Sequence, residues 1–153
     1  MRTIVDVAAH ILDYYGPMTT MKLQKLAYYS QAHCQSTRNQ PLFEEDFQAW
    51  VNGPVCPELY RQHRGKFMLH RGDLDAAVAG RAGLDDYARR EVHAVCDELS
   101  ACTGNELSQR THQESPWLRA RDGYGPSEHC EVVITKDSMK SYYSVHPVVQ
   151  TVF

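Results

Sequence analysis

Apolar and polar residues alternate along the first sixteen positions with the period of an amphipathic helix. Thr3 is suited to cap its start, and Gly16-Pro17 ends the pattern. These features predict a packing helix over residues 4–15. The apolar positions that define its buried face are Ile4, Val7, Ala8, Ile11 and Leu12.

The following segment, TMKLQKLAYYSQAH, carries apolar or aromatic groups on more than one side of a helix. Capped by Thr19 or Thr20, this helix is predicted to run to about residue 36. A helix that is apolar on two sides is usually sandwiched within its domain. The side with Lys25 and Tyr28 therefore either packs beneath another element or contacts a partner protein. The opposite face is expected to pack on the core and contains Leu23, Leu26, Ala27, Ser30 and Cys34.

Two short segments have strand-like patterns. The period-two alternation of FQAWV, residues 47–51, predicts a strand that the turn signal NGP ends. EVVI, residues 131–134, predicts a second strand. The two could pair in one small sheet, and an antiparallel arrangement is the working hypothesis.

The remaining helices are indicated by their start signals. Pro57 suits the first position of a short helix, and Thr103 with Glu106 forms a capping-box pattern, TGNE. Ser115-Pro116 predicts another N-cap and first turn, for a short helix that Gly123 ends. Thr135 is expected to cap a final helix.

Between these helices, residues 69–83 contain three glycines and no sustained period, which favours an irregular connection. The clearest helical stripe in the chain follows it. Its positions are Leu84, Tyr87, Ala88, Val92, Val95 and Leu99.

Composition limits the classes of protein that these elements could form. The chain has 153 residues, is 42% hydrophobic and carries a net charge of −3 without a basic cluster, so direct nucleic-acid binding is not expected. Its five cysteines form no CxxC pair, and no apolar run is long enough to span a membrane. We predict a cytoplasmic, mainly α protein, with one compact domain of about six helices and a small two-stranded β element over residues 1–146, and a tail over 147–153.

The most enzyme-like stretch is THQESPW, where His112 and Glu114 could serve as acid and base. The two residues are two positions apart and would not share a helical face, and no metal-ligand spacing accompanies them. The structural alternative is that His112 bonds backbone groups at a helix end while Trp117 fills the core. No glycine-rich phosphate cradle is present either, so we expect no cofactor and no metal.

Three stretches in this order resemble a bacterial and phage-associated family, the SocA-like or Panacea antitoxin domain. They are KLQKLAYYSQ at 22–31, FQAWVNGPVCPELY at 47–60 and LSQRTHQESPWLRAR at 107–121. The resemblance implies a mainly helical fold and the antitoxin of a type II toxin–antitoxin pair. Such a protein is not an enzyme: it neutralises a cognate protein toxin, encoded by an adjacent gene, through direct binding and occlusion.

The family motifs divide into expected contact residues and expected fold residues. Tyrosine, tryptophan and accessible charged groups dominate binding hot spots. The toxin-binding candidates are therefore Lys25, Tyr28, Trp50, Tyr60 and His112. The motif residues expected to support the fold are Leu23, Leu26, Gly53, Pro54, Pro116 and Trp117.

Two other functions remain open. A protease adaptor would deliver the toxin to a cytosolic protease and could use an exposed tail, Val148 to Phe153, for docking. An enzyme would use His112 and Glu114. The length leaves no room for a DNA-binding segment beside this domain, so operator repression by this chain alone is not expected, and neither nucleic acid nor membrane is a predicted partner.

Overall fold

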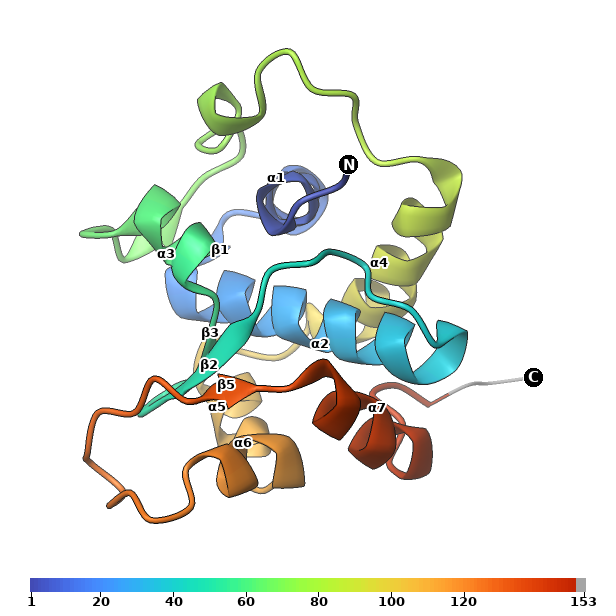
Figure 1. Cartoon of the computed structure of the whole chain (residues 1–153). Coiled ribbons are helices and arrows are strands. Elements are labelled where there is room, and N and C mark those ends of the chain that lie inside the picture. Colours follow the sequence, from blue (N-terminus) through green and yellow to red (C-terminus); the bar gives the residue numbers. More distant parts are fainter. Residues whose placement is uncertain (151–153) are drawn as a thin grey trace.

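The computed structural model describes residues 1–150, which fold into a mainly α domain with two small sheets (Figure 1). The α-helices are α1 (Ile4–Tyr15), α2 (Thr20–Arg38), α3 (Pro57–His63), α4 (Asp86–Leu99), α5 (Gly104–Thr111), α6 (Ser115–Ala120) and α7 (Lys136–Val145), with a 3-10 helix, η1, at Ala76–Val78. The strands are β1 (Met18–Thr19), β2 (Phe47–Trp50), β3 (Gly53–Val55), β4 (Met68–Leu69) and β5 (Val133–Ile134). The predicted fold class is confirmed, with one more α-helix than expected. No helix within residues 1–150 is both long enough and apolar enough to cross a bilayer.

Helix α2 lies at the centre of the domain (Figure 1). It packs against α1, α4, α5, α7 and β3, and twelve of its nineteen residues are buried. The face of Leu23 and Leu26 is completely buried, as predicted. The side of Lys25 and Tyr28 is buried too, because β3 and α7 cover it. On this second side, Tyr28 therefore packs within the domain.

Most helix starts follow the predicted caps. The Thr3 hydroxyl accepts a hydrogen bond from the Asp6 N–H, and Thr103 and Glu106 form the expected capping box. One start differs: Glu114 is the N-cap of α6 and Ser115 is its first residue. The Glu114 side chain makes no capping hydrogen bond because it is turned toward buried tyrosines.

The three-stranded sheet has the order β3-β2-β5, and both pairings are antiparallel. The predicted pairing of the two segments near 47–51 and 131–134 is therefore confirmed, with Phe47 opposite Ile134. Strand β3 was not predicted: the NGP turn leads straight back along β2, which places Gly53 opposite Trp50. The second sheet pairs β1 with β4, two residues each, which is too short to show a period in the sequence.

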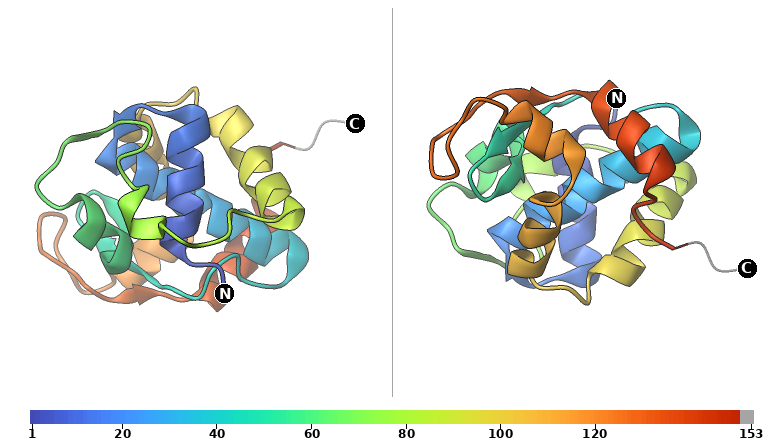
Figure 2. Two further views of the ribbon diagram at one scale, coloured as in Figure 1. Left: turned by 90° about the horizontal axis from the view of Figure 1, so that it is seen from above. Right: turned by 90° about the horizontal axis from the view of Figure 1, so that it is seen from below.

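The irregular connection at 69–83 wraps around α1 in the view from above (Figure 2). It is less irregular than predicted, because β4 ends at Leu69 and η1 lies within it. Leu74 anchors the connection in the core, and Arg81 Nε donates to Asp6 Oδ1 at 2.7 Å. From below, α5, α6 and α7 cover the other side of α2 (Figure 2).

The beginning of the predicted tail is part of the core. Val148 and Val149 are only 3% and 8% exposed, and Arg110 Nη2 donates to the Val148 carbonyl at 2.8 Å. The prediction of an exposed segment starting at Val148 is therefore wrong for these two valines, because they cover apolar surface that the helices leave open. The last part of that segment, 151–153, lies outside the described residues.

Candidate functional site: a pocket beside helix α2

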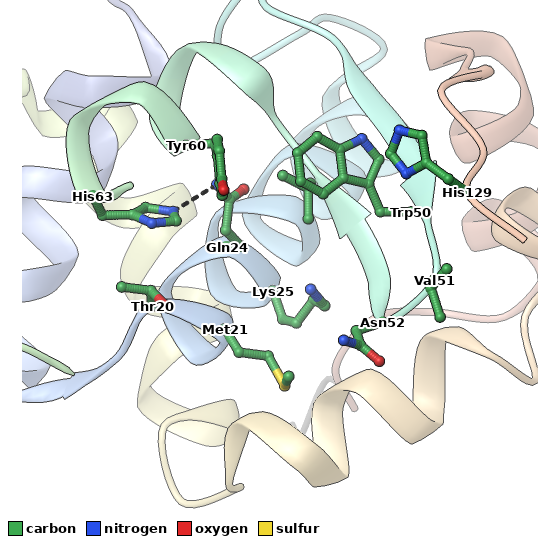
Figure 3. A pocket seen from close by; sticks show the side chains of 11 residues that line it. Thr20, Met21, Gln24, Lys25, Trp50, Val51, Asn52, Tyr60, His63 and His129 are labelled. Carbon is green, nitrogen blue, oxygen red and sulfur yellow. Dashed lines mark hydrogen bonds between the residues drawn. The ribbon is translucent and has the colours of Figure 1, made fainter. Parts of the chain in front are cut away.

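A pocket of about 230 Å³ opens between α2, the β2–β3 hairpin and α3. Figure 3 shows that its side chains come from elements far apart in the sequence. Three of the five predicted contact residues line it. The full lining is Thr20, Met21, Gln24, Lys25, Trp50, Val51, Asn52, Val55, Tyr60, His63 and His129.

Lys25 brings a charged group into this pocket. The residue is 1% exposed, and its ammonium donates to the Pro54 carbonyl at 3.1 Å. Within residues 1–150 this is its single hydrogen bond, and no carboxylate pairs with it. Burial lowers the pKa of Lys25 to about 7, because removal from water disfavours the charged form.

The two motif residues Gly53 and Pro54 explain how Lys25 is held. Gly53 has φ +111°, and a Cβ there would lie 2.6 Å from Lys25 Cε and 2.9 Å from Thr111 Oγ1. Only glycine allows this backbone to lie so close to the lysine stem. The next residue, Pro54, then supplies the carbonyl that the ammonium bonds. Gly53 and Pro54 thus position Lys25 at the pocket.

Aromatic rings form one side of the pocket. The ring of Trp50 contacts Tyr60 edge-on, with centroids 5.1 Å apart, and His129 at 5.7 Å. Tyr60 in turn contacts His63 at 5.4 Å. The Trp50 indole is oriented by its Nε1–H, which donates to Gln48 Oε1 at 2.8 Å. Trp50 and Tyr60 are half-buried, so part of each ring is open to a partner.

Gln24 ties α2 to the start of α3. Its Oε1 accepts the Cys56 N–H at 2.9 Å, and its Nε2 lies 3.0 Å from His63 Nε2 (Figure 3). Burial, with the positive charge of Lys25 acting in the same direction, lowers the pKa of His63. Neither Gln24 nor His63 is among the predicted contact residues, although Gln24 adjoins Lys25 within the first family motif. No sequence signal singled out His63.

The other two predicted contact residues do not line the pocket. Tyr28 is completely buried, its hydroxyl 3.1 Å from that of Tyr143. The prediction of a surface contact at Tyr28 is therefore wrong, because α7 covers it. His112 caps the end of α5 and stacks on Trp117, with ring centroids 4.1 Å apart. Its Nε2 is buried and has no hydrogen-bond partner in residues 1–150.

Trp117 fills the core as predicted and uses its indole N–H as a polar contact. The group donates to the Trp50 carbonyl at 2.8 Å, which links α6 to the strand that carries the pocket. Burial, together with the charges of Lys25 and Arg121, lowers the pKa of His112. His112 and Trp117 therefore support the pocket from behind.

Glu114 belongs to a separate buried network. Its Oε1 accepts hydrogen bonds from the hydroxyls of Tyr29 at 2.5 Å and Tyr143 at 2.8 Å. Its Oε2 accepts one from Arg110 Nε at 3.1 Å. In residues 1–150 no hydrogen bond joins Glu114 to His112, and no cluster of three His, Cys, Asp or Glu side chains is arranged to hold a metal. The Glu114 carboxylate is thus bonded by Tyr29, Tyr143 and Arg110 in this network.

Comparison with known protein families identifies the family of the chain. A family model described as "Antitoxin SocA-like, Panacea domain" matches residues 23–118, which is more than half of the chain. No curated protein and no solved structure matches the chain. The matched region runs from α2 into α6 and includes Lys25, Trp50, Gly53 and Tyr60. The chain therefore belongs to the SocA-like Panacea antitoxin domain family.

Proposed function

We propose that this chain is the antitoxin of a type II toxin–antitoxin pair, and that it neutralises a cognate protein toxin by binding it directly. The observation that carries this proposal beyond family membership is the pocket with Trp50 and Tyr60 at its side. Half-buried aromatic rings beside a concave site are typical of the centre of a binding interface.

The chain segment bonded to the pocket residue Thr20 carries exposed apolar side chains. Phe67 and Met68 are 76% and 38% exposed, and the Phe67 carbonyl accepts the N–H of Thr20, which lines the pocket. A stable protein–protein interface buries roughly 1,200–2,000 Å² in total. The pocket would form its centre and this apolar edge part of its surround. Occlusion of the toxin's active site or substrate groove requires no chemistry by this chain.

The test is co-expression with the product of the adjacent open reading frame, scored for growth rescue and for co-purification. We expect rescue and a stable complex with the wild-type chain, and loss of both with Tyr60→Ala. Tyr14→Ala is the matched control, since Tyr14 is an exposed tyrosine on α1, 54% exposed, and does not line the pocket. Equal loss in both variants would count against the pocket as the binding face.

The same experiment separates the other functions. Rescue without a complex, while the toxin disappears, would favour a protease adaptor. A chain shortened after Val149 would then tell whether residues 150–153 are needed for toxin turnover. No rescue at all would argue against the antitoxin role.

A further inference from the structure

The ammonium of Lys25 is a buried cation with an incomplete set of partners. A protonated lysine carries three N–H donors, and in residues 1–150 only the Pro54 carbonyl accepts from it. The side chain lies along the floor of the pocket (Figure 3). A buried charge of this kind costs free energy unless an opposite charge or further acceptors complete its coordination.

The pocket supplies no such opposite charge. None of its lining residues is Asp or Glu. Two bases lie near Lys25: His63 on α3 lines the pocket with it, and His112 at the end of α5 lies close enough for the lysine charge to lower its pKa. An anion entering the pocket would therefore meet a cation and no carboxylate among the lining residues. The exposed Glu131 carboxylate is paired with the lining residue His129, whose Nε2 lies 2.8 Å from Glu131 Oε2.

We propose that this pocket is a receptor for a single carboxylate, supplied by an Asp or Glu side chain of the toxin next to an apolar or aromatic residue. This inference rests on the proposed function and names the chemistry of the contact. The carboxylate would accept hydrogen bonds from the free donors of Lys25, and the neighbouring apolar group would cover the rings of Trp50 and Tyr60.

The pocket's size and charge favour this ligand. A volume of about 230 Å³ accommodates one side chain and part of a neighbour. One lysine matches one negative charge, whereas the lining has no arginine fork for a phosphate. Met21, Val51 and Val55 suit the methylene groups of an acidic side chain. Phe67 is exposed, and its carbonyl accepts the N–H of the lining residue Thr20, so apolar surface near the pocket suits a macromolecular partner better than a small free acid.

The first test uses the purified chain without toxin. Phenylacetate and its neutral counterpart phenylacetamide are titrated while NMR follows the Trp50 indole N–H and the Gly53 amide N–H. We expect saturable shifts with phenylacetate only, lost in Lys25→Met and kept in Lys66→Met, because Lys66 is exposed and outside the pocket. Equal shifts with phenylacetamide, unchanged binding by Lys25→Met, or no saturable shift would overturn the proposal.

The second test uses the toxin complex. Lys25→Met is expected to weaken toxin binding by about 10- to 100-fold, the usual effect of losing a hydrogen bond to a charged group. Replacing each exposed Asp and Glu of the toxin by its amide should identify one position whose effect disappears in the Lys25→Met background. Thermal unfolding confirms that the variant is folded.

The outcomes distinguish this inference from the proposed function. A toxin complex that forms normally but is unaffected by Lys25→Met overturns the inference alone. A chain that binds phenylacetate but forms no toxin complex overturns the assignment of the carboxylate to a toxin, and the proposed function with it.

Discussion

Glu114 and Lys25 are two buried charged residues of this domain that differ in the number of their hydrogen-bond partners. Glu114 has three donors around its carboxylate, from Tyr29, Tyr143 and Arg110. Lys25 has one acceptor and no anion within residues 1–150. Helix α2 contributes a residue to each site. Lys25 and Tyr29 are four residues apart on this helix and lie on the same side of it. The Glu114 carboxylate, with all of its partners inside the domain, stabilises the fold. The Lys25 ammonium lies at a cavity and has N–H donors left for a ligand.

Removing the satisfied charge should have the largest effect on stability. Glu114→Ala leaves Arg110 and two buried hydroxyls without their acceptor, so we expect the free energy of unfolding to fall by about 3 kcal/mol. Urea denaturation at neutral pH measures it. Glu98→Ala is the matched control, because Glu98 is exposed on α4. Similar losses in the two variants would show that the network contributes little.

The next effect concerns the backbone that holds the unsatisfied charge. Gly53→Ala combines a positive φ with a contact to Lys25 that is too short, so we expect destabilisation of about 2 kcal/mol or more. Gly65→Ala has φ +84° but no atom within 4 Å, and should cost only about 1 kcal/mol. Denaturation curves of both variants separate the effect of the short Cβ contact with Lys25 from that of the positive φ. Equal losses of stability in the two variants would show that the short contact contributes nothing.

Removing the charge of Lys25 should stabilise the protein, whereas the two preceding substitutions should destabilise it. Lys25→Met is expected to raise the free energy of unfolding by about 1–2 kcal/mol at pH 7, since the cost of burying the cation disappears. The folded pKa of about 7 lies below the ordinary 10.5. Between these values Lys25 binds more protons in the unfolded chain, so its contribution makes wild-type stability rise with pH from about pH 7 to about pH 8. At higher pH the buried cysteines and tyrosines, whose pKa values burial raises, act in the opposite direction.

The pH dependence also provides the control for this variant. Stability of Lys25→Met should be flat between about pH 7 and about pH 8. His63 and His112, whose pKa values are lowered, titrate below this range. The buried cysteines and tyrosines, whose pKa values burial raises, begin to titrate in the unfolded chain only above it. Denaturation at a series of pH values measures this. A wild-type curve that does not rise would mean that Lys25 is not held in an unfavourable environment. A more stable variant with weaker toxin binding would show that function retains the buried charge.

The smallest effect is expected behind the pocket. His112→Ala removes a ring stacked on Trp117 but no hydrogen bond of Nε2, so stability should fall by about 1 kcal/mol or less. Toxin neutralisation should be unchanged, as scored by growth rescue. A folded His112→Ala protein that binds toxin but no longer neutralises it would support the enzyme alternative.

Much of the secondary structure could be predicted because its signals are local. The caps at Thr3, Thr103 and Thr135 act on N–H groups three residues further along, and helical periodicity repeats within each segment. The spaced family motifs likewise predicted the family. Of the five contact residues predicted from them, Lys25, Trp50 and Tyr60 line one pocket, and their role in toxin binding stays a prediction. Strands of two residues, such as β1 and β4, carry too few positions to show a period.

Which side chains are buried was decided by the tertiary structure. Lys25 donates a hydrogen bond to the carbonyl of Pro54, 29 positions away. Tyr28 packs against Tyr143, 115 positions away, with their hydroxyls in hydrogen-bond contact. The carbonyl of the buried Val148 likewise accepts a hydrogen bond from Arg110, 38 positions away. The sequence by itself determined where helices start and which family the chain resembles, because those signals lie within single segments. Only packing between distant segments decided that Tyr28 is core and that Lys25 is a buried cation at a pocket.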